Sequence, residues 1–189
     1  MRLKIVQAGD PVLREKAQPL KTDEIVKDEV QRLIRDMQET MRDAPGVGLA
    51  APQVGVPLQL AVIEDQEDFL KNLPAEELAL KGRRPVPFHV LINPQIVRTG
   101  DDKAEFHEGC LSLAGFSAIV PRANTVRVEY LDERGEPASV EAAGWYARIL
   151  QHEIDHLHGT LYIDRMHSRT FTSLDNWNRY GKRKAVSDA

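Results

Sequence analysis

The sequence predicts an α+β protein with an amphipathic helix near its N-terminus and a helix carrying the pattern HExxH near its C-terminus. Apolar residues at helical spacing indicate the first helix, and residues 144–157 form the second. Short apolar runs between the two helices are typical of strands. We expect these strands to form mixed or antiparallel sheets that pack around the C-terminal helix.

The N-terminal helix is predicted from apolar residues that recur every three or four positions. Thr22 or Asp23 is available as its N-cap, and Pro45 predicts that the helix ends near Asp43. The apolar positions are Val26, Val30, Leu33, Ile34, Met37 and Met41. They give the helix one face to bury.

Strands are expected at residues 58–63, 89–96 and 125–130. The last of these should continue through the turn at residues 132–135 into a hairpin with residues 138–142. For the C-terminal helix, Gly159 is well placed as the residue that ends it.

The rest of the chain gives weaker signals. Residues 65–88 are acidic, then Pro-rich and basic, which predicts an exposed excursion with one or two helical turns. We predict a single catalytic domain over residues 1–170 and a partly disordered C-terminal tail over residues 171–189, with a basic cluster at residues 182–184.

Composition restricts the class of protein. A length of 189 residues suits one domain, and a net charge of −4 gives no reason to expect a specific nucleic-acid partner. We also expect no membrane span and no signal peptide, since the required apolar runs are missing. A single cysteine cannot form an internal disulfide, which favours a reducing, cytoplasmic location.

The motif HExxH is formed by His152, Glu153 and His156. Helical residues four apart share a face, so the two histidines can present ring nitrogens to one metal ion. Glu153 can reach a water on that ion, and the motif therefore indicates hydrolysis. A chance match is the alternative, but it would place two histidines on a stripe with Trp145 and Ile149 that is otherwise buried.

A third ligand is needed to complete the metal site. The downstream histidine of some zinc proteases would fall on Tyr162, and no glutamate follows Asp164. Cys110, in the small-residue turn Glu108–Ser112, is the best candidate, because a Cys-His-His set leaves a fourth position open for catalysis. Taken alone, Cys110 fits a small buried hydrophobic residue equally well. Next to an unfinished HExxH site, the ligand interpretation is favoured.

A closed structural zinc site is the other alternative. Its fourth ligand would be His89, His107 or His158, and His158 should point away from His156. A structural metal has no use for a general base such as Glu153, so the sequence favours a catalytic site.

The loop Gly46–Gln53 contains small residues that let backbone pass close to a ligand, although a tight connection between helix and strand explains the glycines equally well. With Glu108–Ser112 and Gln151–Gly159, it gives three motifs that read GVGLAAPQ, EGCLS and QHEIDHLHG. Through these motifs, in this order and over nearly the whole chain, the sequence resembles the peptide deformylases. The stretch from residues 144–145 to residues 168–171 resembles the organelle-like type 1 subgroup, and a bacterial enzyme of that subgroup would fit the absence of a transit peptide.

The resemblance implies hydrolysis of the N-formyl group from the formyl-methionine of nascent polypeptides, with release of formate. It implies that Cys110, His152 and His156 bind the metal, Fe²⁺ in the cell, with Zn²⁺, Ni²⁺ or Co²⁺ able to substitute. Glu153 would take a proton from the attacking water and pass it to the departing amine. Formylated nascent peptides are the expected partners, with at most a transient contact to the ribosome.

The resemblance also assigns supporting roles. The Gln53 side-chain amide and the Leu111 backbone N–H would stabilise the developing oxyanion, and backbone near Gly48 would align the peptide. Arg122 would pair with Glu108 to hold the cysteine loop.

A methionine side chain requires an apolar pocket. Trp145 and Ile149 share the helical face of His152, and Val47 and Phe106 are the candidates for the opposite wall. For each of them, ordinary core packing is the alternative.

Three features concern the edge of the substrate site. Arg148 shares the same helical face and is expected to stay outside, reaching for the peptide or solvent. By resemblance, Ser117 stands where many bacterial deformylases carry a basic residue, and residues 65–88 are longer than the shortest members need.

Two other functions remain open at this stage. A zinc endopeptidase would share HExxH but would show a downstream third ligand and a cleft open on both sides. A metal-binding module without activity would tolerate the loss of Glu153.

Overall fold

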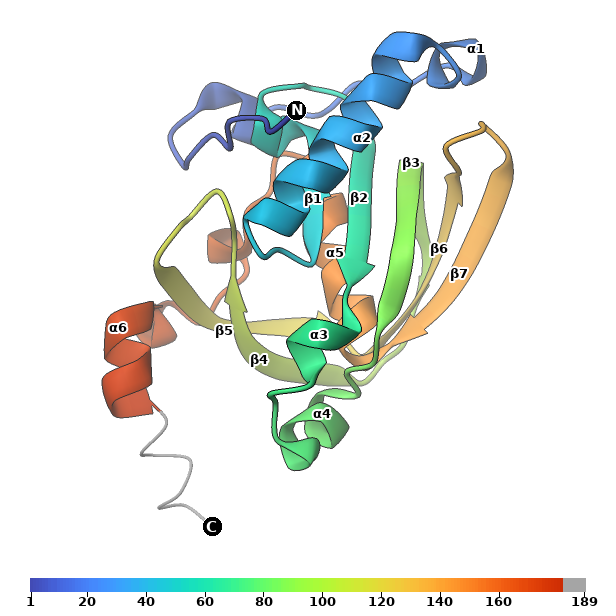
Figure 1. Cartoon of the computed structure of the whole chain (residues 1–189). Helices are drawn as coiled ribbons and strands as arrows, with labels where there is room; N and C mark the ends of the chain where they lie inside the picture. Colours follow the sequence, from blue (N-terminus) through green and yellow to red (C-terminus); the bar gives the residue numbers. More distant parts are fainter. Residues whose placement is uncertain (182–189) are drawn as a thin grey trace.

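The computed structural model describes residues 1–181 and places helix α5 (Gly144–Leu157) between two antiparallel sheets (Figure 1). Both the bounds of α5 and the role of Gly159, which follows the C-cap residue with a φ of 71°, are as predicted. The predicted basic cluster at residues 182–184 lies outside the described residues. Among residues 1–181, no helix combines the length and apolar character that crossing a bilayer requires.

The larger sheet has five strands in the order β1-β2-β3-β6-β7, and every neighbouring pair is antiparallel. The strands are β1 (Gly48–Ala50), β2 (Leu60–Asp65), β3 (Val86–Thr99), β6 (Thr125–Leu131) and β7 (Pro137–Ala143). Three of them match the three predicted strands within a few residues, and β6 and β7 form the predicted hairpin. The α+β class with antiparallel sheets around a C-terminal helix is therefore confirmed.

The smaller sheet has the order β4-β5-β8, with β4 (Lys103–Gly109), β5 (Phe116–Ala123) and β8 (Thr172–Ser173). Cys110 lies in the turn between β4 and β5, where the sequence shows only strand-like flanks. Because β8 pairs with β5, the smaller sheet includes residues that follow the predicted domain boundary at residue 170. Helix α6 (Leu174–Asn176) and a π-helical turn (Trp177–Gly181) follow β8.

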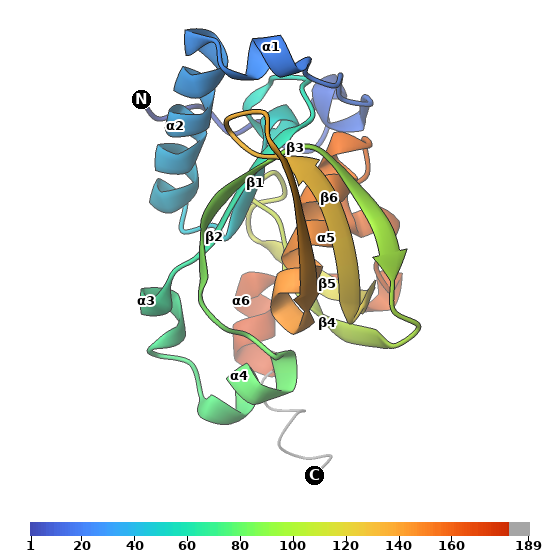
Figure 2. The same cartoon turned by 90° about the vertical axis from the view of Figure 1, so that its right-hand side faces the viewer.

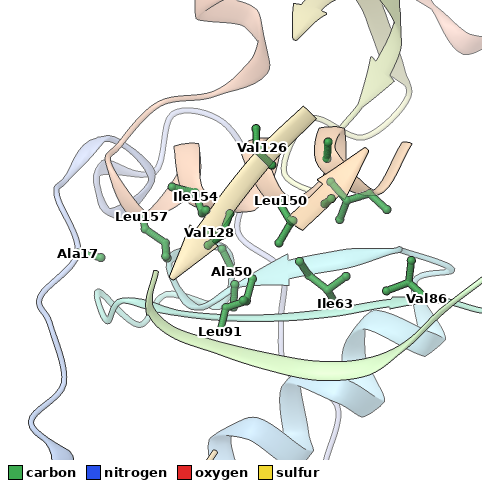
Figure 3. Packing of buried hydrophobic residues seen from close by; sticks show 14 residues of the cluster. Ala17, Ala50, Ile63, Val86, Leu91, Val126, Val128, Leu150, Ile154 and Leu157 are labelled. Atoms are coloured by element: carbon green, nitrogen blue, oxygen red, sulfur yellow. The ribbon is translucent and has the colours of Figure 1, made fainter. Parts of the chain in front are cut away.

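The two faces of the larger sheet are buried by different helices, because side chains alternate along a strand. Ala61 and Ile63 of β2 belong to the core under α5, whereas Leu60 and Val62 belong to the core under helix α2. Figure 3 shows Leu150, Ile154 and Leu157 of α5 packed toward Ala50, Ile63 and Leu91 of the sheet. Figure 2 shows α2 on the opposite side of the sheet from α5.

The N-terminal helix begins later than its apolar pattern predicts. A short helix α1 (Thr22–Ile25) precedes α2 (Asp28–Asp43), whose N-cap is Lys27 and not Thr22 or Asp23. Lys27 is extended, with φ −71° and ψ 146°, so it interrupts the helix and leaves Val26 exposed. Asp28 and Glu29 then favour a new start, because acidic side chains stabilise the first turn. The predicted end at Asp43 is confirmed.

The excursion between β2 and β3 contains two short helices, α3 (Glu67–Leu70) and α4 (Ala75–Lys81), as predicted. Arg83 joins the two ends of the excursion, because it donates to the buried carboxylate of Asp65 at 2.8 and 2.9 Å. Short 3₁₀ helices complete the fold at Pro11–Arg14, Ala51–Val54, Tyr162–Asp164 and Ser168–Thr170.

Candidate metal centre

Cys110, His152 and His156 meet between the two sheets. One ligand atom from each lies within 4.8 Å of the others, and they form the potential metal-binding group found among the described residues. Cys110 follows the last residue of β4, and the two histidines lie one helical turn apart on α5. The Cys110 Sγ atom is 3.3 Å from His156 Nε2. The three predicted ligands are thus brought together by elements far apart in sequence.

The other histidines considered as a fourth ligand lie elsewhere. His89 forms a hydrogen bond with the Tyr146 hydroxyl at 2.9 Å, and His107 contacts Trp177 with ring centroids 3.7 Å apart. His158 is exposed at the C-cap of α5. A closed site with one of these histidines as the fourth ligand is therefore not formed.

A buried carboxylate orients one of the ligands. Glu108 Oε2 accepts a hydrogen bond from His152 Nδ1 at 3.0 Å, which leaves Nε2 of the ring available to a metal ion. Arg122 donates to both oxygens of Glu108, at 2.9 and 3.0 Å, so the predicted pair is confirmed. Arg122 also pairs with Asp155. These bonds hold the pKa of Glu108 below its ordinary value despite its burial, which alone would raise it.

Arg148 is buried, which corrects the expectation that it stays outside. Its side chain is 3% exposed and donates to Glu108 Oε1 at 2.6 Å and to the carbonyl oxygens of Val120 and Ala104 at 2.8 and 2.7 Å. The physical reason is that these acceptors satisfy a guanidinium that would otherwise be costly to bury. All three acceptors are remote in sequence, so the helical pattern alone could not indicate them.

Glu153 is buried close to Gly48 of β1. Glu153 is 4% exposed, and its Oε2 atom has no hydrogen-bond partner among the described residues. Burial raises the pKa of Glu153 to about 7. A Cβ atom placed on Gly48 would overlap the Glu153 carboxyl group, so any side chain at this position would have to displace that group. A carboxyl group with this pKa can accept and release a proton near neutrality.

Gln53 is held in a fixed orientation next to Cys110. The Ala50 N–H donates to Gln53 Oε1 at 2.9 Å, which directs the amide nitrogen toward the cysteine loop. Nε2 then lies 3.3 Å from Ser112 Oγ and 3.5 Å from Cys110 Sγ. Leu111 follows the cysteine directly and is half-buried. Both predicted oxyanion donors therefore belong to the same small region as the ligands.

The charges around the ligand set suit a cation. Burial alone would lower the pKa of His152, but Cys110 and Glu108 raise it well above its ordinary value. The Glu108 carboxylate would likewise favour a positive metal ion at this ring. Burial lowers the pKa of His156, and the neutral imidazole is the form that binds metals. A thiolate with two imidazoles accepts several divalent transition metals and leaves a coordination position open. The residues present thus fit a catalytic metal ion.

A cavity of about 440 Å³ lies beside the ligand set and is lined by Cys110 and His152. Of the predicted pocket residues, Val47, Gly48, Trp145 and Ile149 line it. Phe106 is not among its lining residues and lies next to the Trp145 ring, with centroids 6.4 Å apart.

The lining residues that were not predicted include two large apolar ones, Phe116 and Leu174. Phe116 follows the cysteine turn, and Leu174 begins α6. The pairing of β4 with β5 could have indicated Phe116, but nothing in the sequence pattern indicates Leu174.

Comparison with known proteins gives one consistent result. The family model for polypeptide deformylase matches residues 2–171. Peptide deformylase 1A, chloroplastic, of Solanum lycopersicum is 49% identical over 172 residues, which is 91% of this chain but 62% of the relative. Peptide deformylase 3 of Streptomyces avermitilis is 49% identical over 171 residues, covering 90% of this chain and 74% of that protein.

The fold gives the same match. The Met-Ala-Ser-bound crystal structure of a class I type b peptide deformylase from Acinetobacter baumannii superposes with a TM-score of 0.78 at 30% identity. It covers 88% of this chain and 99% of that one.

Proposed function

This chain belongs to the polypeptide deformylase family, and from that premise we propose that it hydrolyses the N-formyl group from the formyl-methionine of nascent polypeptides, releasing formate. The observation that carries the proposal is that Glu153 and Gln53 line one cavity together with Cys110 and His152, and that His156 completes the ligand set beside them. These are the parts that metal-assisted amide hydrolysis requires: a Lewis acid site, a proton carrier and an oxyanion donor.

Glu153 carries the proton in this proposal. A metal ion bound by Cys110, His152 and His156 would supply Lewis-acid chemistry, making a water more acidic and the formyl carbonyl more electrophilic. Glu153 takes the proton of the attacking water and later gives it to the departing amine nitrogen. Its location against Gly48 and its pKa of about 7 support this role.

The donors around the formyl oxygen are Gln53 and Leu111. Gln53 Nε2 is already directed toward Cys110 by the bond that its Oε1 accepts from Ala50. A donor fixed before the reaction costs no reorganisation when negative charge develops on the oxygen. The Leu111 backbone N–H is the second donor.

Val47, Trp145 and Ile149 form the apolar lining that would receive the methionine side chain, with Gly48 aligning the peptide backbone. Phe106 contributes indirectly, because its ring supports Trp145 and does not face the cavity. An unbranched, polarizable thioether suits such a lining.

We propose Fe²⁺ as the metal, with Zn²⁺, Ni²⁺ or Co²⁺ able to replace it, because a thiolate and two imidazoles accept all four. The partners are formylated nascent peptides, with at most a transient contact to the ribosome. A cytoplasmic location is supported by the single cysteine, which suits a reducing compartment.

The test is to replace Glu153 by Ala and to measure formate release from formyl-Met peptides at known metal content. We expect kcat/KM to fall by about 10²- to 10⁴-fold, the usual contribution of a general acid–base group, while the metal stays bound. Glu76→Ala, on the exposed surface of α4, is the matched control and should behave as wild type.

The same assay separates the two other functions. Equal deformylation by wild type and Glu153→Ala would contradict the mechanism. Cleavage of internal peptide bonds by the wild type would instead identify an endopeptidase, and metal binding without any hydrolysis would identify a binding module.

A further inference from the structure

The chain beyond the part that matches the family model contributes to the wall of the candidate active site. We call residues 171–177 the C-terminal segment. The family model ends at residue 171, yet Leu174 lines the same cavity as the candidate metal ligands Cys110 and His152. Figure 1 shows α6, which contains Leu174, beside the β4–β5 hairpin.

Backbone pairing holds this part of the chain along the edge of β5. The His167 N–H donates to the Ile119 carbonyl at 2.9 Å, and Ser173 lies opposite Phe116 in the strand register. The Leu174 N–H then donates to the Gly115 carbonyl at 2.9 Å. The segment is therefore attached to the hairpin whose turn carries the cysteine ligand.

A ring contact fixes the far end of the segment. Trp177 lies on the His107 ring at a centroid distance of 3.7 Å, and the Asn176 N–H donates to Ser173 Oγ at 3.3 Å. His107 is held in turn by Ser117 Oγ at 3.2 Å. Leu174 lies between the strand pairing of Ser173 and the ring contact of Trp177, so contacts on both sides fix its location.

The segment and β5 together expose an apolar surface, the ledge, made by Phe116, Phe171 and Leu174. The two phenyl rings stack with centroids 5.1 Å apart and an interplanar angle of 8°. The three residues are 41%, 41% and 43% exposed. Large apolar side chains that stay this exposed at the rim of a cavity are often part of a binding surface.

The occupant is indicated by the continuity of the ledge with the cavity. Phe116 and Leu174 belong both to the ledge and to the cavity lining. A nascent polypeptide whose formyl end lies beside Glu153 must leave the cavity through its opening, and its next residues would pass over this rim. Apolar side chains of the peptide would bury apolar surface there, which favours binding, whereas polar side chains would gain much less.

We propose that the ledge binds apolar side chains of the polypeptide downstream of formyl-methionine, so that the C-terminal segment sets a sequence preference beyond the first residue. This inference rests on the proposed deformylase function. Leu174 and Phe171 contact the substrate, whereas Trp177 is a positioning residue that holds the segment in place.

The test uses full-length, metal-loaded protein and formyl-Met peptides in which one Leu replaces Ser at residue 2, 3 or 4. The wild type should prefer Leu at one of these places by a measurable ratio of kcat/KM. Leu174→Ala should reduce that ratio by about five- to tenfold, the size expected for losing one apolar contact. Leu174→Met should retain the ratio, and Trp177→Ala should reduce it as Leu174→Ala does.

Equilibrium binding supplies a second readout that does not depend on turnover. The Kd values of the deformylated Leu- and Ser-containing peptides, measured by calorimetry, should differ in the wild type and converge in Leu174→Ala. Leu80→Ala is the matched control, because Leu80 is 74% exposed on α4 and does not line the cavity.

The outcomes separate this inference from the proposed function. If the wild type releases formate but Leu174→Ala keeps the full Leu-to-Ser ratio, the ledge does not bind the peptide and the deformylase function stands. If the wild type releases no formate from any peptide, the function itself is wrong. A ratio that changes with protein concentration would show that the ledge joins two copies of the chain, and would overturn the inference.

Discussion

Glu153 lies directly against the backbone of Gly48 in the candidate site. The carboxyl group occupies the space in which any side chain at position 48 would begin, and burial keeps its pKa at about 7. A general base acts only when it is within hydrogen-bond reach of the proton it removes. The glycine therefore determines where the proton carrier lies.

Gly48→Ala tests this dependence. The new methyl group must displace the carboxyl group of Glu153, and a shift of about 1 Å can cost about 10²-fold in rate. We expect kcat/KM for formyl-Met peptides to fall by at least about 10²-fold with unchanged metal content, measured by formate release and metal analysis.

A double variant shows whether the effect passes through Glu153. Once Glu153→Ala has removed the carboxyl group, adding Gly48→Ala should cost little more, because effects on one functional unit are not additive. A further fall as large as that of the single Gly48→Ala variant would mean that Gly48 acts on the peptide directly.

Single residues were predictable where their chemistry depends on local spacing. His152 and His156 follow from a separation of four residues, and Cys110 follows from being the only thiol available to complete the pair. The burial of Arg148 could not be predicted in this way. Its acceptors are Glu108 and two carbonyl groups on the smaller sheet, which only the tertiary fold brings next to α5.

At the scale of elements, Arg148 joins α5 to both strands of the β4–β5 hairpin. It bonds Ala104 and Glu108 on β4 and Val120 on β5. Arg122 of β5 adds a second link, to Asp155 of α5. These charged groups are almost completely buried, so removing one partner leaves the others without compensation.

Arg148→Ala should therefore destabilise the fold strongly. We expect the free energy of unfolding to fall by about 3 kcal/mol or more, since breaking a buried ion pair costs about 3–5 kcal/mol. Urea unfolding monitored by circular dichroism measures the change.

The matched control is Arg98→Ala. Arg98 also pairs with a glutamate, Glu141, but the two side chains are 68% and 63% exposed. An exposed pair contributes about 1 kcal/mol or less. If the two variants lost equal stability, the buried network would not be what joins α5 to the hairpin.

Elements whose apolar residues recur with a clear period were predictable, and elements without such a period were not. Helix α5 matched its predicted bounds because its apolar face packs against a sheet over its whole length. In β4, His107 is half-buried like Phe106 and Glu105 is exposed, so no clean alternation identifies the strand. Strand β8 has two residues, and only its pairing with β5 defines it.

At the scale of the whole molecule, the metal ligands connect the two sheets. Cys110 belongs to the hairpin of the smaller sheet, and both histidines belong to the helix that packs on the larger one. A metal ion bound by all three therefore adds a link that the folded chain has and the unfolded chain lacks. Any ligand that binds only the folded state stabilises the whole fold.

Metal removal should accordingly lower the thermal stability of the entire domain. A metal ion at a free concentration of 100 times its Kd adds about 2.7 kcal/mol to the free energy of unfolding. This corresponds to a rise in Tm of about 5–10 °C for a chain of this size. We expect a chelator to lower Tm by that amount in a single transition, and Zn²⁺ to restore it, as measured by scanning calorimetry. Cys110→Ala should make Tm much less sensitive to both treatments, whereas Glu76→Ala should respond as the wild type does. An equal response in Cys110→Ala would mean that the stabilising ion binds outside the Cys-His-His set.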